Sequence, residues 1–358
     1  MNPRSFAVFL LGCILLTPAA HAQIRIHLAG AVSLKDVAFK SIHDFYGPNL
    51  QSANYDNPGR PIAANRMTLS GQMKSLFGDQ TVTLLVNYSG SGPAIQSLTQ
   101  NTPIPYFASA IPGATNLITA PADLGFSVVF QRDYPYPTPV LNDVIYGVTP
   151  TIFVKSPDAP ASLTTLTSQQ YRMIAANGAV PQHVFTGNTN DTDLVYWIMR
   201  DIGAAHRVIS SREAGFTGAA LAYVNRGSSW VLDPVGQPTW PGILAMVTNR
   251  FGPCITFLPP PEAGSVVPEN ILRFNGHLPF TGTYSTVSNN FAPVISGQYT
   301  CWGFEHILTR PTQSPAIATF TAALKAALQT NMETSPYSIP LHRMRVTRNS
   351  TGGVVTPE

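Results

Sequence analysis

Short apolar runs alternate along the chain with segments in which apolar residues recur at helical spacing. Residues 24–28 (IRIHL) predict a strand, and residues 34–46 carry apolar side chains every three or four positions, which predicts a helix. Residues 81–86 (TVTLLV) and 93–98 repeat this arrangement, with Pro93 expected at the first helical position. In both cases a turn of small residues joins the two elements. Such alternation predicts an α/β fold with mainly parallel sheets flanked by helices.

The clearest helical pattern covers residues 314–330. Ser314 is expected to cap this helix, Pro315 stands at its first position, and apolar residues form one face. We assign that face to the hydrophobic core and give it no chemical role. Residues 350–358 show no pattern and are expected to fray.

The N-terminal segment has the features of a secretory signal peptide. Arg4 provides a positive start, residues 6–16 are apolar but too short to span a bilayer, and residues 20–22 (AHA) form a small-residue cleavage site. Residues 1–22 are therefore set aside from the fold. Cleavage after Ala22 predicts a periplasmic or secreted protein, and no later segment is apolar for long enough to span a membrane.

Composition and motifs exclude several classes of function. Charged residues make up only 11% of the chain, and no stripe of Lys and Arg interleaves with aromatic residues, so no nucleic-acid partner is expected. The His residues are scattered without metal-ligand spacing, and neither an HExxH motif nor a nucleophile elbow occurs. The sequence therefore predicts no metal site, no cofactor and no enzyme activity.

Two cysteines, Cys254 and Cys301, follow the expected cleavage site. In an oxidising compartment they can form a disulfide. They are distant in the sequence, however, so we favour two buried free thiols and keep the disulfide as the alternative.

Three turns of small or polar residues follow expected strands, at residues 29–33 (AGAVS), 89–92 (SGSG) and 200–203 (RDIG). Ligands of α/β folds bind at the carboxyl ends of strands, and a helix that begins there presents free N–H groups to an anion. Arg200 adds a cation that can bind an oxyanion through two hydrogen bonds. The three turns together are candidates for an anion site.

Each turn also has a simpler interpretation. Ser33 can be a helix N-cap without any role in ligand binding. Residues 89–92 can form an ordinary loop, and Arg200 can pair with Asp201. A dinucleotide-binding fingerprint is not favoured, because Ile95 stands where its third Gly is required.

On these turns the chain resembles the phosphate-binding solute receptors of bacterial ABC importers, which have the type II periplasmic binding protein fold. The resemblance covers most of the chain after residue 22. The matching segments are residues 31–34 (AVSL), 86–88 (VNY), 90–92 (GSG), 106–110 (YFASA), 200–206 (RDIGAAH) and 297–305 (GQYTCWGFE). The last of these concerns the hinge and scaffold rather than the ligand.

The resemblance implies two lobes that are joined by hinge crossings and close on an anion. Lobe I is expected to contain residues 23–115 and 290–358, and lobe II residues 116–289. The implied partners are a small oxyanion such as phosphate and an ABC permease. The implied ligand-binding residues are Ser33, Leu34, Ser91, Arg200 and His206.

The chain also departs from the family pattern. The family's Asp acceptor is replaced by Ala110, and its Ser and Thr donors are replaced by Ala204 and His206. An alternative function is therefore a scaffold or interaction protein that kept the fold and lost the ligand. If His206 binds the ligand, its positive charge below about pH 6.5 predicts that anion affinity rises as pH falls towards 5. The simpler interpretation is that His206 caps a helix or faces solvent.

Overall fold

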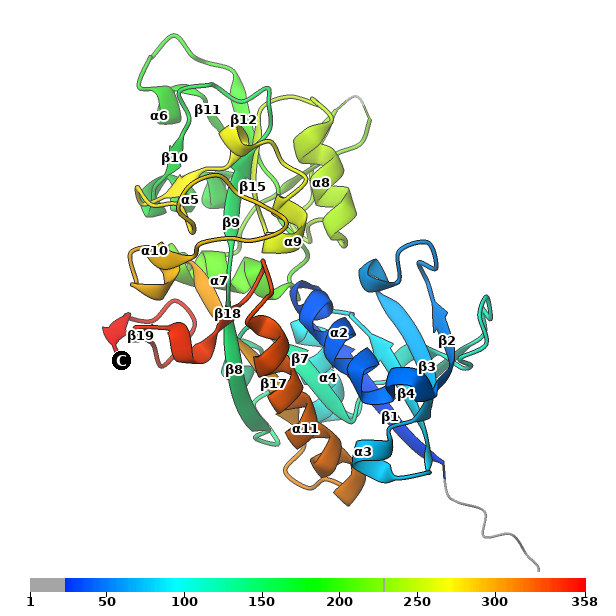
Figure 1. Cartoon of the computed structure of the whole chain (residues 1–358). Helices are drawn as coiled ribbons and strands as arrows, with labels where there is room; N and C mark the ends of the chain where they lie inside the picture. Colours follow the sequence, from blue (N-terminus) through cyan, green and yellow to red (C-terminus); the bar gives the residue numbers. More distant parts are fainter. Residues whose placement is uncertain (1–22, 228) are drawn as a thin grey trace, which may run out of the picture.

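The computed structural model describes residues 23–227 and 229–358 and contains two lobes, each built on a mixed β-sheet (Figure 1). The predicted signal peptide lies outside the described residues. The expected two-lobed α/β fold is confirmed.

The first lobe is built on an eight-stranded sheet. Its strands, in spatial order, are β18 (Ile339–Pro340), β8 (Asn142–Pro150), β17 (Trp302–Thr309), β7 (Leu124–Ser127), β1 (Ile24–Gly30), β4 (Thr81–Asn87), β3 (Arg66–Gln72) and β2 (Leu50–Tyr55).

The second lobe is built on a four-stranded sheet. Its order is β11 (Ala179–Pro181), β12 (Leu194–Trp197), β15 (Cys254–Leu258) and β9 (Ile152–Lys155). Four two-stranded pairs complete the β-structure: β5 (Ile104–Phe107) with β6 (Leu117–Ala120), β10 (Thr165–Leu166) with β16 (Arg273–Phe274), β13 (Tyr223–Asn225) with β14 (Trp230–Leu232), and β19 (Val346–Thr347) with β20 (Thr356–Pro357).

Ten α-helices are present in the described residues. They are α2 (Lys35–Tyr46), α3 (Lys74–Phe77), α4 (Ser91–Gln100), α5 (Ser168–Asn177), α6 (His183–Thr186), α7 (Ala205–Glu213), α8 (Trp240–Thr248), α9 (Pro260–Ala263), α10 (Ala292–Ile295) and α11 (Pro315–Met332). The prediction for the longest helix is confirmed, because the Ser314 hydroxyl accepts a hydrogen bond from the N–H of Ile317 at 3.3 Å.

The sheets are less parallel than the sequence predicts. Within the two main sheets, only β4–β1–β7 and β12–β15 pair in parallel, and the flanking strands are antiparallel. The separate pair of β10 and β16 is also parallel. The antiparallel strands flank the parallel ones in each sheet. Short connections, such as the one between β2 and β3, allow neighbouring strands to pair in this way.

The sheet order also differs from the expected lobe boundaries. The expectation assigned residues 116–289 to lobe II, but β7 and β8 lie in the large sheet beside β1 and β17. The chain passes from one sheet to the other between β8 and β9, and it returns just before β17. We therefore propose boundaries near residues 150 and 301.

Two hydrogen bonds join the outgoing and returning strands of this crossing. The N–H of Thr151 donates to the carbonyl of Cys301 at 2.9 Å, and the Tyr299 hydroxyl donates to the carbonyl of Thr151. Both Tyr299 and Cys301 are fully buried. The two strands therefore form a paired hinge between the lobes.

The two cysteines are free and buried, as favoured from the sequence. Cys254 begins β15 in the second lobe, whereas Cys301 precedes β17 at the hinge. No helix within residues 23–227 or 229–358 combines the length and hydropathy needed to cross a membrane. Over the same ranges, no group of three His, Cys, Asp or Glu side chains is arranged to hold a metal ion.

Candidate ligand-binding cleft

The carboxyl ends of the parallel strands in the two lobes point toward each other (Figure 1). In the first lobe, β1 leads to residues 31–35 and β4 leads to residues 88–91. In the second lobe, β12 leads to residues 198–204 and β15 leads to residues 259–262. All three turns predicted from the sequence therefore lie between the lobes.

The lobes touch directly at this position. The Tyr134 hydroxyl, from the loop between β7 and β8, donates to the carbonyl of Gly203 at 2.8 Å. Gly92 in the first turn of α4 lies so close that a Cβ added there would be 2.9 Å from the Gly203 oxygen. The structure therefore shows the lobes in contact rather than spread apart.

Three helices begin at this interface without a side-chain cap. The N-cap residues of α2, α4 and α7 are Leu34, Gly90 and Ala204, and none of them accepts a hydrogen bond from its helix through a side chain. The uncapped first turns of α4 and α7 leave N–H groups available and carry a partial positive charge, whereas the N–H of Lys35 at the start of α2 donates to the carbonyl of Val32 in the preceding 3-10 turn. This arrangement suits an anion placed between the lobes.

Ser33 is not the N-cap of the first helix. A 3-10 turn, Val32–Leu34, precedes α2, so the helix begins two residues after Ser33. The Ser33 side chain is buried, and its hydroxyl has no hydrogen-bond partner among the described residues. A buried hydroxyl without a partner is costly unless something else binds it.

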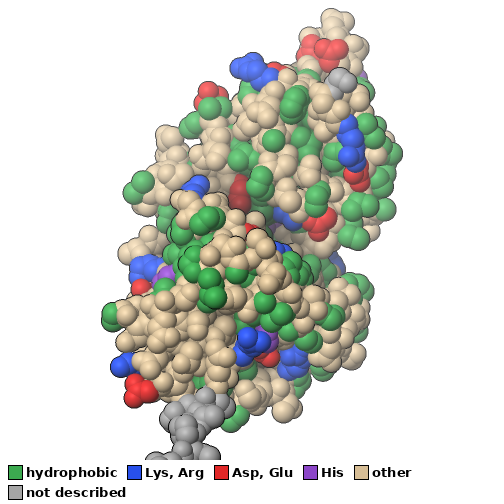
Figure 2. Space-filling view, turned by 90° about the vertical axis from the view of Figure 1, so that its right-hand side faces the viewer, with side chains coloured by type: hydrophobic (Ala, Val, Ile, Leu, Met, Phe, Trp, Pro, Cys, Tyr) green, Lys and Arg blue, Asp and Glu red, His purple; other side chains and the backbone are tan. Residues whose placement is uncertain are grey.

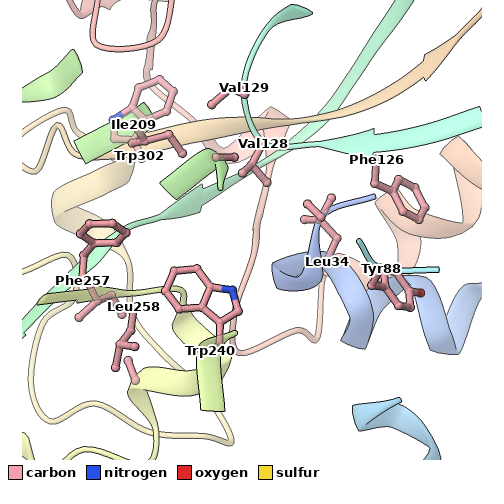
Figure 3. Packing of buried hydrophobic residues seen from close by; sticks show 14 of the residues in the cluster. Leu34, Tyr88, Phe126, Val128, Val129, Ile209, Trp240, Phe257, Leu258 and Trp302 are labelled. Carbon is pink, nitrogen blue, oxygen red and sulfur yellow. The ribbon is translucent and has the colours of Figure 1, made fainter. Parts of the chain in front are cut away.

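Leu34 packs in the hydrophobic core and is only 1% exposed. Figure 3 shows it beside Tyr88 of the first lobe and opposite Trp240 of the second. The apolar core therefore continues across the interface between the lobes.

Ser91 is the first residue of α4, two positions before the predicted start at Pro93. Pro93 still stands in the first turn, where its missing N–H costs no helical hydrogen bond. The buried Ser91 hydroxyl accepts a hydrogen bond from the N–H of Val128 at 3.2 Å. Its own proton remains available for donation to a ligand.

Arg200 is held firmly at the end of β12. Its Nε donates to the carbonyl of Gln237 at 3.0 Å, its Nη2 donates to Asp201 at 2.8 Å, and its guanidinium carbon lies 4.5 Å from the centre of the Trp240 ring. The simpler interpretation, a pair with Asp201, is thus confirmed. A guanidinium has five N–H donors, so these contacts orient the group and leave capacity for an anion.

His206 does not behave as predicted. Its Nδ1 lies 2.8 Å from the hydroxyl of Thr151 at the hinge, and its ring meets Trp240 edge-on at 5.8 Å. Burial, with a smaller contribution from the positive charge of Arg200, lowers the pKa of His206 to about 3. This lowered pKa argues against a cationic His206 near pH 5.

The sequence analysis missed three polar residues at the interface. Lys35 begins α2, Tyr88 follows β4, and Glu262 lies in α9 after β15. The Tyr88 hydroxyl and the Glu262 Oε2 are buried without a hydrogen-bond partner in the described chain. Tyr88 and Lys35 lie beside turns that were predicted from the sequence, so their positions could have identified them as candidate site residues. Glu262 had no motif around it.

Ala110, which replaces the family's acidic acceptor, lies near the edge of the large sheet. Its carbonyl accepts a hydrogen bond from the Ser52 hydroxyl of β2 at 2.6 Å, and Asn54 of the same strand donates to Ser109 and Ala114 at 3.3 and 2.8 Å. β2 is the edge strand of the large sheet, two strands away from β4. The segment around Ala110 is therefore anchored to the edge of that sheet.

Comparison with known proteins agrees with this architecture. A phosphate transport receptor of ABC type from Vibrio cholerae is 14% identical, with a TM-score of 0.51, over 88% of this chain and 100% of that one. A phosphate ABC transporter substrate-binding protein with bound phosphate, from Clostridium perfringens, is 11% identical, with a TM-score of 0.52, over 88% of this chain and 99% of that one. No protein-family model and no curated protein matches the chain.

The chain therefore has the two-lobed α/β fold of solute-binding receptors. The resemblance inferred from the turns in the sequence is confirmed at the level of the fold. The two neighbours named above, which share this fold, are a phosphate transport receptor and a substrate-binding protein of a phosphate transporter.

Proposed function

We propose that this protein is a solute-binding receptor that holds a small oxyanion, of the phosphate type, between its lobes. In this proposal it acts in the periplasm or outside the cell, passes its ligand to an ABC permease and catalyses no reaction. The shared fold of the phosphate receptors supports the class, and the chemistry of the cleft supports an anionic ligand.

The observation that carries the proposal is that hydrogen-bond donors with free capacity lie at the strand ends on both sides of one interface. Ser33 offers a buried hydroxyl without a partner, Ser91 retains a free proton, and Arg200 is oriented with donors to spare. Three uncapped helix N-termini surround them. An anion bound here gains several hydrogen bonds from groups that are already in place, so little ordering is needed on binding.

The paired hinge at residues 151 and 301 gives the fold a way to open and close on the ligand. Closure of such lobes is a rigid-body movement that excludes water from the ligand. His206 contacts the hinge through Thr151, and its Nε2 is buried without a hydrogen-bond partner among the described residues.

A thermal-shift titration tests the proposal. The chain without residues 1–22 is partially unfolded to remove any bound ligand, refolded, and titrated with phosphate, sulfate and small carboxylates. An anion that binds only the folded state raises the melting midpoint. Arg200→Ala removes charge-assisted hydrogen bonds worth about 1.5–3 kcal/mol, so affinity is expected to fall roughly 10- to 150-fold.

Ser33→Ala separates binding from folding. Because the Ser33 hydroxyl bonds nothing in the described structure, its removal is expected to weaken anion binding without lowering stability. Ser97→Ala is the matched control, since the buried Ser97 hydroxyl accepts the N–H of Ala122 at 2.8 Å. That variant is expected to lose stability and keep its affinity. No shift with any anion would favour the ligand-free scaffold instead.

A further inference from the structure

A basic and an acidic side chain lie on opposite sides of the interface between the lobes. Lys35 follows β1 at the carboxyl edge of the first lobe, and Glu262 follows β15 at the carboxyl edge of the second. Figure 1 shows α9 directly above the N-terminal end of α2. Each group lies within the electrostatic field of the other, yet no ion pair within 4.0 Å joins them.

Lys35 is positioned by neutral groups of its own lobe. Its Nζ donates to the carbonyl of Ala63 at 3.0 Å and to the Asn65 Oδ1 at 2.7 Å, and it lies 5.9 Å from the centre of the Tyr88 ring. An ammonium has three N–H donors, so one donor is left for a ligand. No carboxylate of the described residues neutralises Lys35 by direct contact.

Glu262 has a free acceptor where Lys35 has a free donor. The residue as a whole is half-buried, but its Oε2 is inaccessible to solvent and has no hydrogen-bond donor among the described residues. Burial raises the pKa of Glu262 to about 7, while the charges of Lys35 and Arg200 oppose that rise. A buried carboxyl oxygen without a donor is unfavourable unless a ligand supplies one.

We propose that Lys35 and Glu262 are ligand-binding residues that act from opposite lobes, Lys35 on a negatively charged oxygen and Glu262 as acceptor from a donor group on the same ligand. This inference rests on the proposed function and narrows its ligand class. The cleft then selects an oxyanion or carboxylate that also carries a hydroxyl or an acid proton.

Other charged and titratable groups surround the pair. Arg200 acts on Glu262 within the second lobe, and Asp56 and Arg60 act on Lys35 from the loop before β3. Tyr284 and Tyr337 also lie within the field of Glu262. Figure 2 shows the waist between the lobes, with both acidic and basic side chains along it. The opposite charges in this region suit a ligand that offers both an acceptor and a donor.

Calorimetric titration with matched ligand pairs tests the assignment. Phosphate at pH 7 carries an acid proton and sulfate does not, while lactate differs from propionate by one hydroxyl. The protein is expected to prefer the donor-bearing member of at least one pair by tenfold or more. Glu262→Ala is expected to reduce this preference to less than about twofold. Lys35→Met is expected to weaken both members of the pair equally.

Two further variants keep the result interpretable. Glu269→Ala, at an exposed position shortly after α9, is expected to retain the full preference. Glu262→Gln keeps the size but loses the charge and one of the two acceptor oxygens, so it is expected to reduce the preference and replaces the alanine variant if that variant fails to fold. A preference that survives in both Glu262 variants overturns this inference while leaving the anion receptor intact. A wild-type chain that binds none of the four anions overturns the proposed function itself.

Discussion

Arg348, in the C-terminal segment, forms a buried ion pair with Glu213 at the end of α7, with 2.8 Å between Nη1 and Oε2. The two side chains are 1% and 11% exposed. The guanidinium carbon of Arg348 also lies 3.8 Å from the centre of the Trp302 ring, and its Nη2 donates to the carbonyl of Thr300. The C-terminal segment therefore ties the first lobe to a helix of the second, beside the hinge.

Removing this arginine is expected to destabilise the protein strongly. Arg348→Ala leaves the Glu213 carboxylate buried without its partner, and breaking such a pair costs about 3–5 kcal/mol. Urea unfolding monitored by tryptophan fluorescence measures the loss. Arg345→Ala changes an exposed arginine of the same segment and is expected to stay within about 0.5 kcal/mol of the wild type. Equal stabilities of the two variants would show that the pair contributes nothing.

A buried glutamate is expected to make the protein less stable at alkaline pH. Glu305 in β17 is fully buried; its Oε1 accepts a hydrogen bond from the Ser338 hydroxyl at 2.7 Å, and its Oε2 has no partner in the described chain. Burial raises the pKa of Glu305 to about 8. Between about pH 4.5 and 8 the folded state therefore holds a proton that the unfolded chain releases, so stability falls as pH rises through this range.

Glu305→Gln tests this linkage because it keeps the shape and removes the titration. The pH dependence of the unfolding free energy is expected to become shallower by up to about 1.4 kcal/mol per pH unit. Unfolding curves at pH 5, 7 and 9 measure the difference, with the exposed Glu269→Gln as control. Parallel curves for wild type and Glu305→Gln would contradict the prediction.

His206 is expected to remain neutral between pH 5 and 8. Burial, followed by the charge of Arg200, lowers its pKa to about 3, whereas His in an unfolded chain has a pKa of about 6.5. The unfolded state therefore binds the proton first, and stability falls as pH decreases from about 6.5 towards 3. The imidazole proton signals of His206, assigned by their loss in His206→Gln, should stay constant from pH 5 to 8. A midpoint near pH 6.5 would refute the assignment.

Local sequence patterns were sufficient to predict several helices and strands and some of the candidate site residues. The pattern around Ser314 located the longest helix, and the small-residue turns located Ser33, Ser91 and Arg200 at the carboxyl ends of strands. These features depend on neighbouring residues, which a sequence displays directly. The capping role considered for Ser33 failed because a 3-10 turn delays the start of α2, and that turn has no sequence signal of its own.

Features that depend on contacts between distant segments were not predictable in this way. Glu262 comes within the electrostatic field of Lys35 only because the two sheets place their carboxyl edges toward each other. Residues 350–358 were expected to fray, but β20 pairs with β19, and the Thr351 hydroxyl donates to Asp133 at 2.6 Å. The position of β7 and β8 in the large sheet was missed for the same reason, since strand order is decided by tertiary packing rather than by local pattern.

The contact between Gly92 and Gly203 predicts a variant that holds the lobes apart. A Cβ at Gly92 would lie 2.9 Å from the Gly203 carbonyl oxygen and 3.0 Å from the Tyr134 ring, so Gly92→Ala cannot close in the same way. Because Gly203 belongs to the other lobe, movement at the hinge relieves the contact with its carbonyl, whereas the Tyr134 ring has to shift within the first lobe. Strain of about 1–3 kcal/mol in the closed form corresponds to a roughly 5- to 150-fold loss of anion affinity. Small-angle X-ray scattering should show a larger radius of gyration for this variant. Gly59→Ala, where an added Cβ meets nothing within 4 Å, should match the wild type in both measurements. An unchanged radius together with unchanged affinity would show that closure does not depend on this contact.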